Sequence, residues 1–236
     1  MAFDVYVGSL TRYIVGNWEN PGKRYAREHG IEYNIIRPRA KPEDAVTDPQ
    51  VIQEAVVLWR QSLEIGLKSN LPGGLPWDEG FDSPYFTERP NWEGYTSLLL
   101  HAAHVKQPQF PRPAEPDPDY EQNETYLTAT AAESTSPLVQ LLTAEIWLPN
   151  DFDFTFKFED VIGNQVVFGS SVSLLKELKE LTVESYEGSE TDPAKWKYPE
   201  SGNDNPFEQA ARVGLEIFQH LAEMSVQHRL PMKLDY

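Results

Sequence analysis

Phenylalanine occupies every second position from residue 152 to residue 158, and this alternation constrains the fold more than any other feature of the chain. The residues between the four phenylalanines are polar. A period of two places the aromatic rings on one face of a β-strand and the polar side chains on the other. Gly163 and Asn164 follow as a tight turn, and residues 165–168 lead back. The pattern predicts a β-hairpin near residues 152–168 and a sheet with one buried face.

Apolar residues at helical spacing lie on both sides of the hairpin. The clearest run starts at Asp48, a good N-cap, with Pro49 at the first helical position. Asn91 is expected to cap a second long helix. Further helices are predicted over residues 21–29, 136–142, 171–181 and 206–228, and further strands over residues 3–8, 31–37 and 144–148. We therefore expect an α+β fold, with a single mixed or antiparallel sheet packed against about four to five helices.

One Pro-rich stretch is the only candidate for a domain boundary. Five prolines fall between residues 108 and 118, and proline fixes φ and removes a backbone donor. This composition predicts an extended lid or linker near residues 107–120. Because predicted strands lie on both sides of it and the chain has no internal repeat, we expect residues 1–236 to form a single α+β domain.

The charge of the chain is strongly acidic and unevenly distributed. The formal net charge is −17, and residues 107–236 hold 9 basic and 23 acidic residues. No Lys or Arg occurs from Pro113 through Phe156. Such a field repels nucleic-acid phosphates and anionic lipid, and it attracts cationic molecules. We therefore expect no nucleic acid and no membrane as partner, and a basic protein is the partner that the charge favours.

The residue types also limit the chemistry and the location. The chain contains no cysteine, which excludes disulfides, thiolate metal sites and a cysteine nucleophile. It has no Gly-rich nucleotide loop and no GxSxG elbow, so we expect no cofactor. The first residues lack the basic and apolar regions of a signal peptide, and no apolar run reaches 18 residues. These features predict a cytoplasmic protein without a transmembrane helix.

Polar residues at the end of the first predicted strand form one candidate ligand site. Asp4 lies within that strand, and Arg12 and Tyr13 follow where it ends. An arginine, a carboxylate and a phenol at a strand end suit the recognition of an anion or an amide. The alternative is an Asp4–Arg12 ion pair that only stabilises the turn.

A second group of candidates lies in the segment between the two long predicted helices and in the second of them. Residues 71–90 combine prolines, glycines and aromatic residues, and Trp77 and Asp78 are its candidate ligand-binding residues. His101 and His104 are three residues apart on the following helix, a spacing that a metal site can use. The same spacing fits an inward-facing His101 and a solvent-facing His104, and we therefore predict no metal site.

Both ends of the chain resemble a known group of proteins. The opening FDVYVGSLTRY and the ending HRLPMKLDY resemble a bacterial family of uncharacterised proteins. The resemblance implies a bacterial cytoplasmic protein of comparable length. It implies no activity, so no site residue is carried over from it.

Three functions follow as hypotheses. The acidic charge favours a protein-binding or inhibitor protein, such as an immunity protein that neutralises a basic toxin. The alternative is an enzyme that acts on a small molecule in a pocket near Arg12, the 75–86 loop and His101. The high aromatic content is also compatible with a structural role through oligomerisation, although core burial explains it equally well.

Overall fold

A single mixed sheet of six strands organises the computed structural model, which describes residues 3–32, 48–131 except 72 and 76, 137–186 and 205–235. The strands lie side by side in the order β2-β1-β6-β3-β5-β4. Only β3 and β5 are parallel, and every other neighbouring pair is antiparallel. The strands are β1 Asp4–Val7, β2 Phe86–Glu88, β3 Ile146–Leu148, β4 Phe156–Glu159, β5 Gln165–Ser170 and β6 Met232–Asp235. The expected α+β class with a single sheet is confirmed.

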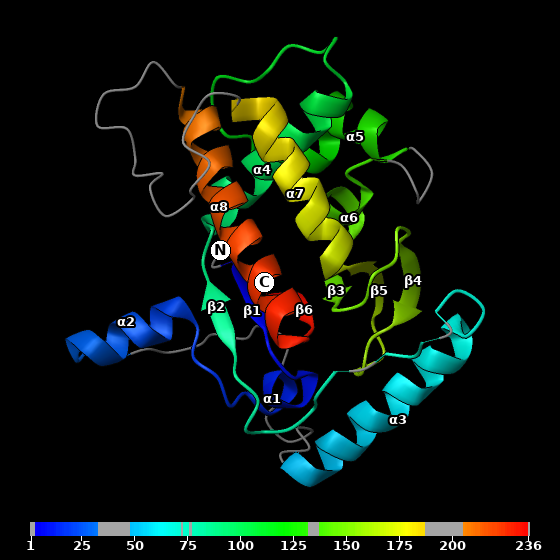
Figure 1. The fold of residues 1–236 in the computed structure, drawn as a ribbon. Coiled ribbons are helices and arrows are strands. Elements are labelled where there is room, and N and C mark those ends of the chain that lie inside the picture. The colour runs from blue at the N-terminus through cyan, green and yellow to red at the C-terminus, as the bar shows by residue number, and fades with distance from the viewer. Residues whose placement is uncertain are drawn as a thin grey trace.

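Helices cover both faces of this sheet, as Figure 1 shows, with α4, α6, α7 and α8 on one side and α1 and α3 on the other. The described α-helices are α1 Leu10–Val15, α2 Pro21–His29, α3 Pro49–Leu67, α4 Asn91–Lys106, α5 Glu124–Thr130, α6 Val139–Thr143, α7 Ser171–Tyr186 and α8 Pro206–His228, with a 3-10 turn η1 at Tyr120–Gln122. None of these helices is both long enough and apolar enough to cross a membrane.

The hairpin read from the phenylalanines is present. β4 pairs with β5 in antiparallel register, and Phe156 lies opposite Phe168 with their rings stacked at 5.5 Å. The strand begins later than the alternation does, because hydrogen-bonded pairing starts only at Phe156. Phe152 precedes the strand and is still buried in the core between the sheet and α3. The alternation therefore marks burial beyond the end of the strand.

The larger core lies between the sheet and the helix pair α4 and α8. α4 is buried on nearly all sides from Gly94 to His104, because α8, α5, α6 and α7 pack around it. Gly94 and Gly214 allow the backbones of α4 and α8 to approach each other closely. Phe3 stacks on Tyr95 at 4.2 Å, and Tyr95 stacks in turn on Phe218. The N-terminal strand and the C-terminal helix thus share one hydrophobic core.

The structure differs from the sequence-based predictions at a helix start and at two strands, and one predicted strand lies mostly outside the described residues. Asn91 does not cap α4; it is the first helical residue, has a positive φ of 59°, and follows Pro90 in the cap position without a side-chain cap hydrogen bond. Most of the strand expected over residues 31–37 lies outside the described residues, and the amide of Ile31 instead donates to the carbonyl of Ala26 beyond the end of α2. β2 and β6 were not expected as strands, and β6 lies in the centre of the sheet.

Part of the Pro-rich stretch lies against the helical layer. The amide of Phe207 donates to the carbonyl of Ala114, and the Trp92 indole donates to the carbonyl of Pro118. Arg112 forms an ion pair with Glu208 at the start of α8. These contacts connect the stretch to α4 and α8.

Candidate functional site

Asp4 is part of a buried ion pair on β1. Its carboxylate is 2% exposed and accepts two hydrogen bonds from Arg89, at 2.7 Å from Nε and 2.9 Å from Nη2. This bidentate geometry is strong and specific. Arg89, and not Arg12, is therefore the ion-pair partner of Asp4.

Arg12 and Tyr13 are neighbours on α1 but face different cavities. The Arg12 guanidinium lies 5.0 Å from the centre of the Tyr85 ring and lines a polar hollow that also contains Lys23. Tyr13 donates its hydroxyl to Asp235 at 2.6 Å, and its ring lines a second cavity beside β6. These two candidates therefore do not act on one ligand together.

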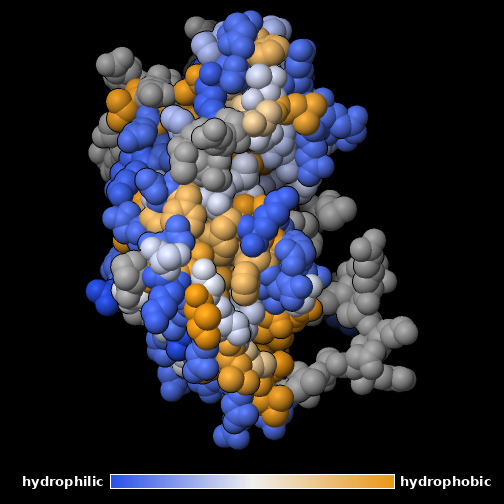
Figure 2. All heavy atoms as spheres, turned by 90° about the vertical axis from the view of Figure 1, so that its right-hand side faces the viewer, coloured by the Kyte–Doolittle hydropathy of each residue, from blue (hydrophilic) through white to orange (hydrophobic). Residues whose placement is uncertain are grey.

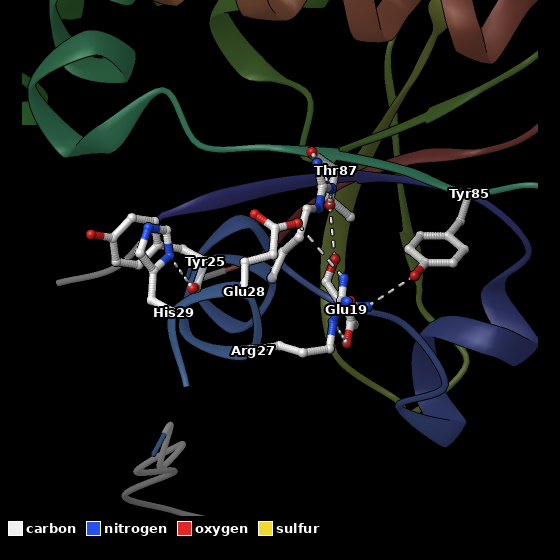
Figure 3. Close-up of polar contacts among 8 residues, drawn as sticks. Glu19, Tyr25, Arg27, Glu28, His29, Tyr85 and Thr87 are labelled. Atoms are coloured by element: carbon white, nitrogen blue, oxygen red, sulfur yellow. Dashed lines mark hydrogen bonds and ion pairs between the residues drawn. The ribbon is translucent and has the colours of Figure 1, made fainter. Parts of the chain in front are cut away.

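A network of polar side chains joins α2 to the edge strand β2, as Figure 3 shows. Glu19 accepts from Arg27 Nε at 3.1 Å, and its amide donates to the Tyr85 hydroxyl at 3.4 Å. Thr87 donates its hydroxyl to the carbonyl of Glu19 at 2.9 Å. His29 stacks on Tyr25 at 3.9 Å. Each of these groups interacts with another residue of the chain. We therefore infer that the network positions α2.

Trp77 and Asp78 are bound within their own loop. The Trp77 indole donates to Glu79, whose buried carboxylate also accepts from the amides of Leu10 and Thr11 at the start of α1. Asp78 accepts from the Ser83 hydroxyl and the Gly80 amide, and these two hydrogen bonds lower its pKa. The loop is thereby attached to α1.

His101 lies on the opposite face of the sheet from α1 and the loop. Its ring is 1% exposed, and its Nδ1 lies 3.5 Å from Glu208 Oε2. The contact with the His101 ring and its charge, followed by the hydrogen bond and the charge of Arg112, lower the pKa of Glu208 to about 2. The pocket expected between Arg12, the 75–86 loop and His101 is therefore not formed, because the sheet separates His101 from the other two.

His104 is buried, and the expectation that it faces solvent is wrong. It is 2% exposed and meets the Phe207 ring edge-on at 6.5 Å. Burial, followed by the charges of Arg112 and His101, lowers its pKa. α8 and the Pro-rich stretch cover this side of α4, which a single helix pattern does not reveal. In the part of the chain that the structure describes, no three His, Asp or Glu side chains are grouped so as to hold a metal ion.

A cavity of about 350 Å³ on the α1 and α3 face of the sheet is the site that the sequence did not indicate. Tyr13 of α1 and Trp59 of α3 contribute its aromatic walls, and the start of β3, the hairpin turn and β6 supply the rest. Most of its lining is apolar, and its polar side chains are Tyr13, Glu145, Asp160, Asn164, Gln165 and Lys233. Ligand pockets have this composition, with a few convergent polar groups in an apolar wall.

Lys233 extends into this cavity from the central strand. Its neighbours Met232 and Leu234 belong to the core on the other face of the sheet, and strand alternation turns Lys233 toward the cavity. Its Nζ lies 5.4 Å from the centre of the Tyr13 ring and forms no hydrogen bond with any described residue. Burial lowers the pKa of Lys233, and the nearby carboxylates of Asp160, Glu145 and Asp235 counteract part of that shift.

The other polar groups around Lys233 form hydrogen bonds within the protein. Asp160 accepts from the amides of Ile162 and Asn164 at 3.0 and 2.9 Å, within the hairpin turn. Glu145 accepts from the amide of Val167 at 3.3 Å. The Trp59 indole donates to the carbonyl of Glu159 at 2.7 Å. The walls are thus oriented by internal hydrogen bonds, and the Lys233 amine is available to a ligand.

An acidic segment lies on the far side of the molecule, around η1 and α5. Four exposed carboxylates there form no ion pair with a described residue. They belong to Glu115, Asp119, Glu121 and Glu124. Tyr120 lies among them but is 6% exposed, because its ring packs against Trp92, Tyr95 and Tyr126. The segment is therefore held on an aromatic cluster.

No family model, no curated protein and no solved structure matches this chain. Its function is therefore inferred from the geometry of its own sites.

Proposed function

We propose that the protein acts on a small carbonyl compound with an apolar body, which binds in the cavity beside Lys233 and condenses with the lysine amine. The observation that carries the proposal is an amine that opens into an apolar cavity without a hydrogen-bond partner among the described residues. A cavity of about 350 Å³ is within the range of small-molecule pockets.

The chemistry follows from the properties of an amine in such a site. A lysine becomes nucleophilic when desolvation favours its neutral form, and burial acts in that direction on Lys233. The neutral nitrogen attacks the carbonyl carbon to give a carbinolamine, and loss of one water molecule then forms an imine. Addition of one water molecule to the imine regenerates the carbinolamine, which then releases the carbonyl compound and the free amine. The carboxyl groups of Glu145 and Asp160 face the same cavity and are the groups available to exchange protons there.

Reductive trapping tests this proposal. Benzaldehyde and cyanoborohydride at neutral pH should label Lys233 at least about tenfold faster than other lysines, because only its amine opens into the cavity. Lys106 is the matched control, since burial also lowers its pKa but its Nζ donates to the carbonyl of Ala129 at 2.8 Å. Peptide mass spectrometry gives the rate at each lysine, in the wild type and in the K233M and K106M variants.

The outcomes are distinct. The expected result is that K233M loses the fast phase and K106M keeps it. Labelling of Lys233 no faster than that of Lys106 or of the exposed Lys157 would disprove an imine-forming site.

We propose a basic protein partner as a second candidate function, supported by the acidic segment around η1 and α5. Aligned carboxylates accelerate the encounter with a cationic surface, and anchoring by Tyr120 reduces the ordering that binding would require. We expect an ordered acidic surface of this kind in an inhibitor of a basic protein, such as an immunity protein. The net charge of −17 also supports a protein that does not bind nucleic acid.

Charge removal tests the second candidate with an octa-arginine peptide as probe. The D119N/E121Q/E124Q variant should bind it about tenfold more weakly at low salt. A variant with three other exposed acids neutralised, E54Q/D82N/E180Q, carries the same net charge and should lose less than about twofold. Equal losses in both variants would show that only the net charge matters and would remove the acidic segment as a site.

A further inference from the structure

An exposed apolar stripe runs along the outer side of α3. Val51, Leu58 and Ile65 are 48%, 64% and 77% exposed and are spaced seven residues apart. The opposite side of the helix packs on the sheet through Val56 and Leu63, which are fully buried. Figure 2 shows the side of the molecule that lies on the right in Figure 1, and hydrophobic side chains gather in its lower part, where α3 lies. Contiguous exposed apolar surface of this kind marks an interaction site.

Small residues alternate with the large ones along the stripe. Ala55, Ser62 and Ser69 follow Val51, Leu58 and Ile65 at a distance of four residues, which gives the 3-4 spacing of a coiled-coil seam. The two serines are compatible with burial. The Ser62 hydroxyl donates to the carbonyl of Leu58 at 3.2 Å, and the Ser69 hydroxyl donates to Asn70 at 2.9 Å.

We infer that α3 is a homodimer interface, in which the stripe of one chain packs antiparallel against the stripe of a second copy. In an antiparallel pair centred between Leu58 and Ser62, each large residue meets a small one, with Leu58 against Ser62 and Ile65 against Ala55 of the other copy. A parallel pair would place large against large and small against small. The antiparallel pair therefore fills its layers evenly.

The charges along the stripe favour the same direction. Glu54, Gln61 and Lys68 flank the seam at one heptad position, are exposed, and form no ion pair with a described residue. In the antiparallel pair Glu54 faces Lys68 of the other copy, twice, and Gln61 faces Gln61 across the two-fold axis. In a parallel pair these residues would instead face the position occupied by Ile52, Trp59 and Gly66 of the other copy, so no Glu54–Lys68 pair would form. Flanking charges of this kind set the orientation of paired helices.

Sedimentation equilibrium at micromolar concentration tests the inference, with a dimer as the expected state. L58E should raise the dimer dissociation constant by about a hundredfold or more, because it would bury two carboxylates in the seam. L127E is the matched control, since Leu127 on α5 is also exposed, at 54%, and lies outside the stripe. A monomeric wild type, or equal effects of the two variants, would overturn the inference.

Two further pairs of variants report the direction of the helices. E54K should weaken the dimer, and E54K/K68E should restore it, which a parallel pair does not predict. Because the chain has no cysteine, Q61C and E54C each introduce a single thiol. A short bis-maleimide should join two copies of Q61C but not of E54C, whose thiols would lie about 21 Å apart along the antiparallel pair. Efficient cross-linking of E54C would contradict the antiparallel arrangement.

Discussion

At the residue scale, several ionisable groups are buried in the mostly apolar interior of this protein. Asp4 is compensated by Arg89, and Glu208 by His101 and Arg112. Glu177 on α7 differs, because among the described residues its carboxylate accepts hydrogen bonds from the amides of Gln140 and Leu141 alone, at 3.1 and 2.9 Å. Burial raises its pKa to about 7, although these two hydrogen bonds and Lys106 oppose the shift. Glu177 is therefore an acid whose ionisation costs stability near neutral pH.

The pH dependence of folding should show this cost. The folded state holds the Glu177 proton more tightly than the unfolded state does, so the contribution of Glu177 to stability is greatest below the ordinary pKa of 4.5 and falls as the pH rises through about 7. The loss is up to about 3 kcal/mol at 1.36 kcal/mol per unit. Glu177→Gln keeps an acceptor without the charge. Its stability relative to wild type should increase by about 2 to 3 kcal/mol between about pH 5 and about pH 8.

Urea unfolding at the two pH values measures this change. Glu180→Gln, at an exposed position one turn away, should shift the same difference by less than about 0.5 kcal/mol. His104 has its pKa lowered and acts in the opposite direction in both proteins, so it cancels from the comparison. A Glu177→Gln variant whose relative stability does not depend on pH would contradict the assignment.

At the element scale, the approach of α4 to α8 depends on one glycine more than on the other. A Cβ on Gly214 would lie 2.9 Å from the carbonyl carbon of Gly94 and 3.0 Å from Leu98 Cβ. A Cβ on Gly94 would meet its nearest atom, the carbonyl oxygen of Ala210, at 3.5 Å, which is an ordinary contact. Backbone atoms cannot rotate away as a side chain can, so only Gly214 is sterically required.

Alanine at the two positions should therefore have opposite effects. Gly214→Ala should destabilise the protein by about 1 to 3 kcal/mol or more, because the two helices must move apart. Gly94→Ala should be neutral or should stabilise it by up to about 1 kcal/mol, because alanine is the better helix former. Thermal and urea unfolding of both variants measure the difference. Similar destabilisation by both would mean that the contact is symmetric.

At the scale of the whole molecule, the C-terminal segment completes the sheet. β6 pairs with β1 on one side and with β3 on the other, and it therefore joins the N-terminal strands to the hairpin half of the sheet. Leu230, Met232 and Leu234 are all buried in the main core. The last strand of the chain is thus a central one, which must form before the sheet is continuous.

Removal of residues 230–236 should therefore abolish cooperative unfolding. The truncated chain would expose the inner edges of β1 and β3 and lose three buried apolar side chains. Near-UV circular dichroism and urea unfolding detect this loss, and removal of residue 236 alone is the control. A truncated protein that still unfolds in one sharp transition would show that the two halves of the sheet are stable without β6.

Local patterns in the sequence were sufficient for the elements that carry their own signals. Asp48 and Pro49 begin α3, Pro206 begins α8, and the phenylalanine alternation gives the hairpin, because caps and periodicity act over a few residues. Both ends of the chain offered only short apolar runs. Nothing local shows that residues 232–235 form the central strand, or that Phe86–Glu88 pairs with β1, since pairing is a long-range choice.

The candidate sites also depended partly on local sequence signals and partly on long-range contacts. The sequence identified Asp4, Arg12 and His101 as chemically capable residues, but only the tertiary structure decided that the sheet separates His101 from Arg12 and that Arg89 neutralises Asp4. Lys233 gave no local signal, because a lysine between Met232 and Leu234 becomes a cavity residue only when β6 enters the sheet and α1, α3 and the hairpin turn surround it. Composition and short-range periodicity determine which segments fold and which faces are buried. Contacts between distant segments decide where an amine, a carboxylate and an apolar wall meet.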